Sequence, residues 1–120
     1  MFHIDFKSRV PIFKQVLDNF KQKIYKGELV PDERVPSIRE LAKTLGVNPN
    51  TVQKAYRELE EKGFFYTVQG QGSFIASPLE EQKKEEIENI FVQMKKLKDE
   101  LIIYGVEEDE IFMCIKGGTQ

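Results

Sequence analysis

The chain has 120 residues, of which 40% are hydrophobic and 32% are charged, and its net charge is −2. This length suffices for one modest core with an appendage rather than for two full domains. No apolar run approaches the roughly 18 residues of a membrane-spanning helix, and the first residues lack the apolar segment of a signal peptide. We therefore expect a cytoplasmic protein without a membrane partner.

Cys114 and His3 are the single cysteine and histidine of the chain. They provide neither a disulfide framework nor an ordinary Cys/His zinc site, so we expect no metal. The sequence also lacks a phosphate-cradling loop and a nucleophile paired with a base, and we expect neither a cofactor nor enzyme activity. Cys114 lies in the apolar run IFMCI, where a small buried hydrophobe is the main interpretation and a redox-sensing thiol the alternative.

The charges divide the chain into two parts. Residues 1–76 carry 12 Lys/Arg and 9 Asp/Glu, a balance of +3, whereas residues 77–120 carry 6 and 11, a balance of −5. The basic first part is the one that suits a polyanion, and the acidic second part is expected to contact something else.

The first predicted element is an amphipathic helix that begins near Pro11 and ends at Gly27. Its apolar residues recur with helical spacing at Ile12, Val16, Leu17, Phe20 and Ile24. The stretch VPDERVP that follows has two prolines in seven residues and no periodicity, so it is predicted to be a connector.

A short second helix is predicted to begin after Ser37. Ser37 and Glu40 have the spacing of a capping box, in which each side chain bonds the other residue's amide. One face is apolar, with Ile38, Leu41, Ala42 and Leu45. Gly46 is expected to end the helix.

A third helix is predicted from Asn48, a natural N-cap, through Pro49 to Gly63. At about 100° per residue, its apolar residues face one side and Gln53, Lys54 and Arg57 the other. Amide and guanidinium groups bond bidentately to purine edges, and a helix fits the major groove of B-DNA.

The start of this helix is expected to bind a DNA phosphate. Free amides of Asn50 and Thr51, the Thr51 hydroxyl and the positive end of the helix dipole would suit that anion. The alternative for the polar stripe is a solvated helix face.

The stretch FFYTVQGQGSFIA is rich in aromatic and β-branched residues and predicts a short hairpin with its tip at Gly70–Gly72. A highly charged helix is then expected from about Leu79 to Tyr104, with Gly105 ending it and one more short helix following. Its apolar residues form a heptad seam of Ile87, Ile90, Met94, Leu97, Leu101 and Tyr104.

So short a seam is not stable alone, and we expect it to pack against a second copy of the chain. The alternative is that the seam closes the core of its own monomer against Ile12, Val16 and Phe20.

The order of these elements, a helix-turn-helix followed by a hairpin, is typical of a winged helix-turn-helix. The stretch RVPSIRELAKTLGVNPNTVQKAYRELEEKGFFYTVQGQGSFI resembles the DNA-binding domain of GntR-type bacterial transcription regulators, over residues 10–76. The helical tail resembles the small YtrA-type branch. The resemblance implies a mainly α fold with a small β-hairpin wing, comprising a DNA-binding domain at 1–76 and a helical dimerisation tail at 77–120.

The resemblance also implies DNA-contacting roles for Arg39, Asn48, Asn50, Thr51, Gln53 and Gly70. The helical wheel adds Lys54 and Arg57, although Arg57 could instead pair with Glu60 or Glu61. Many relatives carry Arg where this chain has Pro49 and Gln53, which puts the shared sequence preference in doubt. At the wing tip Gln71 is neutral where a base is common, so wing binding should depend less on salt.

We therefore expect a sequence-specific regulator of transcription, a repressor, that binds an inverted repeat in double-stranded DNA as a homodimer. The alternative is a winged-helix module for protein–protein contact. A small-molecule effector is not indicated, because 44 residues after the wing leave little volume for a pocket, although a dimer interface could form one.

Overall fold

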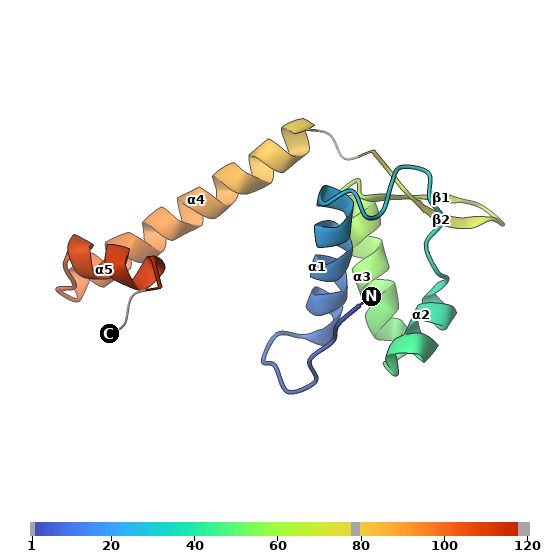
Figure 1. Cartoon of the computed structure of the whole chain (residues 1–120), viewed down its shortest axis with the longest axis horizontal. Coiled ribbons are helices and arrows are strands. Elements are labelled where there is room, and N and C mark those ends of the chain that lie inside the picture. The colour runs from blue at the N-terminus through green and yellow to red at the C-terminus, as the bar shows by residue number, and fades with distance from the viewer. Residues whose placement is uncertain (1, 78–79, 118–120) are drawn as a thin grey trace. The chain divides into compact units, whose positions relative to one another are not determined.

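The computed structural model describes residues 2–77 and 80–117. These residues fall into two units, Met1–Pro78 and Leu79–Gln120. In the described residues, the first unit has three helices and a β-hairpin and the second has two helices (Figure 1). This composition confirms the predicted fold class, which is mainly α with one small hairpin.

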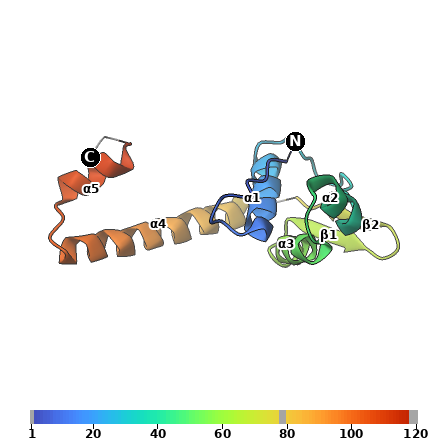
Figure 2. The same cartoon turned by 90° about the horizontal axis from the view of Figure 1, so that it is seen from below.

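The three helices of the first unit are α1 (Ile12–Tyr25), α2 (Ile38–Leu45) and α3 (Pro49–Glu61). α1 and α3 lie side by side, and α2 packs against α3 (Figures 1 and 2). Their buried side chains join those of the hairpin in one core, which includes Val16, Leu17, Phe20, Val52, Ala55, Leu59, Phe64, Phe65 and Ile75. The inner face of α1 is thus filled by residues of its own unit.

Local capping defines the ends of α2. The Ser37 hydroxyl accepts a hydrogen bond from the Glu40 amide at 3.1 Å, and the Glu40 carboxylate accepts one from the Ser37 amide at 3.0 Å. This reciprocal pair is the predicted capping box. Gly46 ends the helix in the left-handed conformation, with φ at 70°, which a glycine adopts without steric cost. Both predicted ends of α2 are therefore confirmed.

The hairpin consists of β1 (Phe65–Val68) and β2 (Gly72–Ile75), which pair antiparallel. Val68 lies opposite Gly72, so residues 69–71 form the tip. This is the wing that the sequence predicted after the third helix.

Residues 30–36, predicted to be a connector, add a further pairing to the wing. Arg34 forms an isolated antiparallel bridge with Phe74 of β2, and the Val35 amide donates to the Ser73 carbonyl at 3.0 Å. The prediction missed this pairing because two prolines in seven residues hide any strand pattern.

The second unit consists of α4 (Glu80–Ile103) and α5 (Glu108–Ile115), which contact each other. Gly105 lies in the turn between them with φ at 88°, as predicted. The expected start of the long helix at Leu79 lies outside the described residues, and Tyr104, the last residue of the predicted seam, follows the end of α4.

The apolar side chains of this unit are mostly exposed in the single chain. α4 has no buried residue among those described, and Ile111 of α5 is buried with 7% of its surface exposed. The prediction that Cys114 is a buried hydrophobe is wrong for the single chain, because the thiol is exposed on α5. Among the described helices, none is long and apolar enough to cross a membrane.

Candidate nucleic-acid interface

The outer face of α3 carries two polar side chains that are free to bind. Gln53 and Arg57 are exposed, whereas Val52 and Ala55 on the inner face are completely buried. Neither polar side chain forms a hydrogen bond or ion pair within the described residues. The predicted opposition of a packing face and a polar face is therefore present in the folded helix.

Lys54 differs from its two neighbours on the stripe, because its side chain contacts α1. Its ammonium nitrogen lies 3.9 Å from the centroid of the Phe13 ring. A cation over an aromatic face is held by the ring's electron-rich surface. A DNA contact by Lys54 would have to compete with this intramolecular contact.

Asn48 organises the first turn of α3, where Pro49 is the first helical residue. Its side-chain oxygen accepts a hydrogen bond from the Asn50 amide at 2.8 Å, and its carbonyl accepts one from the Thr51 amide at 3.0 Å. The expectation that these two amides are free for a phosphate is wrong, because the N-cap residue satisfies both. The hydroxyl of Thr51, which is half-buried, forms no hydrogen bond within the described residues.

Arg39 is exposed on the first turn of α2 and makes no ion pair within the described part of the chain. The pairing of Arg57 with Glu60 or Glu61, which the sequence left open, is not formed either.

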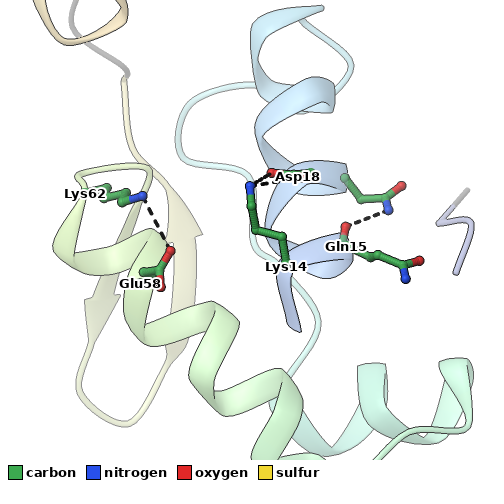
Figure 3. A network of polar contacts seen from close by, with 6 residues as sticks. Lys14, Gln15, Asp18, Glu58 and Lys62 are labelled. Carbon is green, nitrogen blue, oxygen red and sulfur yellow. Dashed lines mark hydrogen bonds and ion pairs between the residues drawn. The ribbon is translucent and has the colours of Figure 1, made fainter. Parts of the chain in front are cut away.

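Two exposed ion pairs neutralise lysines on α1 and α3. Lys14 lies 2.9 Å from Asp18, and Lys62 lies 3.5 Å from Glu58 (Figure 3). Such surface pairs contribute little to stability, but they leave less positive charge available to a polyanion. The unpaired guanidinium groups are therefore better placed to bind DNA than these lysines.

The wing is tied to the connector by a side-chain contact. The Tyr66 hydroxyl donates a hydrogen bond to the Asp32 carboxylate at 2.7 Å, and this bond raises the pKa of the Tyr66 phenol. At the tip, Gly70 has φ at 80° and no heavy atom near the position of a side chain. The backbone can thus approach a surface closely there.

The folded chain brings one residue to this surface that the sequence did not indicate. Arg34 is exposed and lies beside Gly72 of the wing, where Nε would be 3.4 Å from a side-chain carbon on the glycine. The only local signal was a single arginine between prolines, and its placement depends on pairing with β2, which is a tertiary contact.

The described residues contain no candidate metal site. Within 2–77 and 80–117 there is no group of three or more His, Cys, Asp or Glu side chains that could hold a metal ion.

The chain is similar in sequence to known bacterial regulatory proteins. Residues 13–75 match the sequence profile described as bacterial regulatory proteins, gntR family. The chain is 38% identical over 120 residues to the HTH-type transcriptional repressor YtrA of Bacillus subtilis (strain 168), which covers 97% of this chain and 90% of that protein.

Solved structures show the same relationship. The crystal structure of a transcriptional antiterminator from Listeria monocytogenes EGD-e has a TM-score of 0.76 and 37% identity, over 98% of this chain and 88% of that one. The AraR DNA-binding domain in complex with operator ORX1 has a TM-score of 0.57 and 31% identity, over 62% of this chain and 96% of that one. The chain thus belongs to the GntR family of bacterial regulatory proteins, and it is similar to YtrA along nearly its whole length.

Proposed function

We propose that the protein is a sequence-specific DNA-binding regulator of transcription, and a repressor. The observation that carries this proposal is the one-sided surface of α3, where Gln53 and Arg57 are exposed and unpaired opposite a completely buried face. The match to a family of regulators, and to an operator-bound DNA-binding domain, supports this function over protein docking.

In this proposal α3 enters the major groove. Gln53 and Arg57 read base edges, because an amide and a guanidinium each bond a purine at two points. Thr51 and Asn50 lie on the first turn and contact the backbone through their side chains, since their amides are already bonded to Asn48. Phosphate contacts of this kind fix the register without reading sequence.

Two elements outside α3 complete the contact. Arg39 reaches the DNA from the first turn of α2, and the wing follows the minor groove with Gly70 at its tip. Because the tip residues Gln69 and Gln71 are neutral, the wing adds little to the salt dependence of binding.

We also propose that the protein acts as a homodimer through its second unit. Leu97 is 60% exposed and Ile90 56% exposed in the single chain, although both belong to the predicted seam. Phe91 and Ile102 are exposed as well, and they widen the apolar stripe of α4 to an arc of about 140°.

In a simple coiled coil only the a and d positions of each heptad are apolar, and they form a narrower stripe than this arc. An apolar arc of this width suits packing against more than one helix. α5 supplies further exposed apolar residues, namely Phe112, Met113 and Ile115. We therefore expect the α4 and α5 helices of two copies to form one bundle.

A two-fold dimer would present two α3 helices to half-sites about 34 Å apart, or a multiple of that spacing, on an inverted repeat. Chromosomal DNA as the target places the protein's action in the cytoplasm. No catalytic step is part of this function.

The test is selection of random double-stranded DNA by the purified protein at near-physiological salt, followed by sequencing of the retained duplexes. We expect an enriched inverted repeat whose half-site spacing reports the dimer. A variant with Gln53→Ala and Arg57→Ala serves as the control and should lose the enrichment while keeping its fold. Retention of no preferred sequence by the wild type, together with binding that is insensitive to salt, would favour the protein-docking function instead.

A further inference from the structure

Arg34 is held against the wing by backbone pairing. Its bridge to Phe74 and the 3.0 Å hydrogen bond from the Val35 amide to the Ser73 carbonyl fix the main chain on this edge of β2. A side-chain carbon at Gly72 would meet the guanidinium, at 3.4 Å from Nε and 3.6 Å from Nη2. These are ordinary van der Waals distances, so the arginine side chain lies against β2 at Gly72.

Arg34 lines a hollow of about 200 Å3 between the wing and the start of α2. Its walls include the hydroxyl-bearing residues Ser37, Tyr56 and Ser73, together with Gly72. This space admits a phosphate group, which would accept hydrogen bonds from the Arg34 guanidinium. The Ser37 hydroxyl is engaged with Glu40 and the Ser73 hydroxyl shares a 3.2 Å hydrogen bond with Thr67, so the arginine supplies the donors.

The Arg34 guanidinium has no direct partner within the first unit, and its charge acts only at longer range on the Glu40 carboxylate, whose pKa it helps to lower. The Arg34 side chain forms neither a hydrogen bond nor an ion pair among the described residues. The nearby Glu40 carboxylate is engaged by the Ser37 amide at 3.0 Å in the capping box. An exposed guanidinium on a fixed backbone, with its donors unbound, is preorganised for an anion.

We infer that Arg34 is a phosphate-binding residue that holds the DNA backbone between the wing and the start of α2. The inference rests on the proposed function and extends it to a contact that neither α3 nor the wing tip makes. A phosphate contact is independent of sequence, so Arg34 sets affinity and register rather than base preference.

The first experiment measures binding of the full-length wild type and of Arg34→Ala to two duplexes, the selected operator and an unrelated sequence, over a series of salt concentrations. We expect Arg34→Ala to weaken binding to both duplexes by the same factor, about tenfold. The slope of log K against log salt should fall by about 1. The melting temperature of each variant confirms that it is folded.

Two further variants separate a local contact from a general effect of charge. Lys26→Ala removes another exposed cation, one that does not line the hollow, and its binding should match the wild type. Glu40→Gln keeps the capping box, because glutamine serves at that position, and removes the negative charge beside Arg34. Glu40→Gln should strengthen binding to both duplexes. The gain should be smaller when the same substitution is made in the Arg34→Ala variant.

Wild-type affinity and salt slope in Arg34→Ala would overturn the inference while leaving the proposed function intact. A loss confined to the operator would also overturn it, since that pattern belongs to base reading. If the wild type itself bound neither duplex at any salt concentration, the proposed function would fail, and this inference with it.

Discussion

The phenol of Tyr56 donates a 2.8 Å hydrogen bond to the carbonyl oxygen of Pro36. The bond joins the middle of α3 to the residue before the N-cap of α2. Burial, with the Glu40 charge as a smaller influence, raises the pKa of this phenol, so it remains a protonated donor throughout the neutral range. One bond thus couples the helix that would enter the groove to the start of its neighbour.

Tyr56→Phe should lower the free energy of unfolding by about 1 kcal/mol, because it leaves the Pro36 carbonyl without its partner in a partly buried place. Urea denaturation followed by circular dichroism measures this difference. Tyr66→Phe is the matched control: it removes the exposed hydrogen bond to Asp32 and should cost less. Equal losses in the two variants would contradict a special role for the Tyr56 contact.

The capping box predicts that the stability of the folded chain depends on pH. Hydrogen bonds from the Ser37 amide, and then from its hydroxyl, lower the pKa of Glu40 below its ordinary value of 4.5. Because the folded pKa is the lower one, the stabilisation is complete above the ordinary value and is lost as the pH falls through the folded pKa. NMR titration should find the lowered pKa, and Ser37→Ala should raise it. An unchanged titration of Glu40 in Ser37→Ala would contradict the hydroxyl's contribution.

If α3 reads base edges as proposed, removing a reading side chain should weaken binding in a way that depends on the DNA sequence. Gln53→Ala should weaken operator binding by about 1–3 kcal/mol and change binding to unrelated DNA far less. Lys62→Ala, whose ammonium is paired with Glu58 at the end of α3, is the control and should alter neither. Fluorescence anisotropy with both duplexes measures the difference, and an equal loss on the two would assign Gln53 to the backbone.

If the second unit forms the dimer interface as proposed, a charged side chain in that interface should change the oligomeric state. Leu97→Glu should convert the dimer to a monomer, because it places a charge in the proposed apolar interface. Val92→Glu is matched to it, since Val92 and Leu97 are 54% and 60% exposed in the single chain, but Val92 lies on the opposite side of α4. Sedimentation velocity should show a monomer for the first variant and a dimer for the second. Two dimers would contradict the assignment of the interface.

The sequence predicted the elements that depend on neighbouring residues. Ser37 and Glu40 form a cap within four residues, Gly46 needs only its own backbone freedom, and Pro49 acts through its own ring. Such features do not require knowledge of the fold. The order of elements then sufficed to predict the winged helix-turn-helix.

Contacts between segments that are far apart in the chain could not be predicted from the sequence. The pairing of residues 30–36 with β2 and the position of Lys54 over Phe13 depend on how the helices and the wing pack. The assumption of free amides at Asn50 and Thr51 failed for a smaller reason, since the N-cap residue accepts from both. The DNA-contacting and dimerisation roles of individual residues stay predictions until the experiments above are made.

Because α4 has no buried side chain in the single chain, the proposed dimer would tie the survival of the chain to its abundance. A helix that gains its packing only from a partner is stable in the dimer and marginal in the monomer. We expect dilute protein to keep a folded first unit while its tail becomes open to proteases. The amount of regulator in the cell would then set its own rate of degradation, so that occupancy of a DNA site rises more steeply than the total concentration of chains.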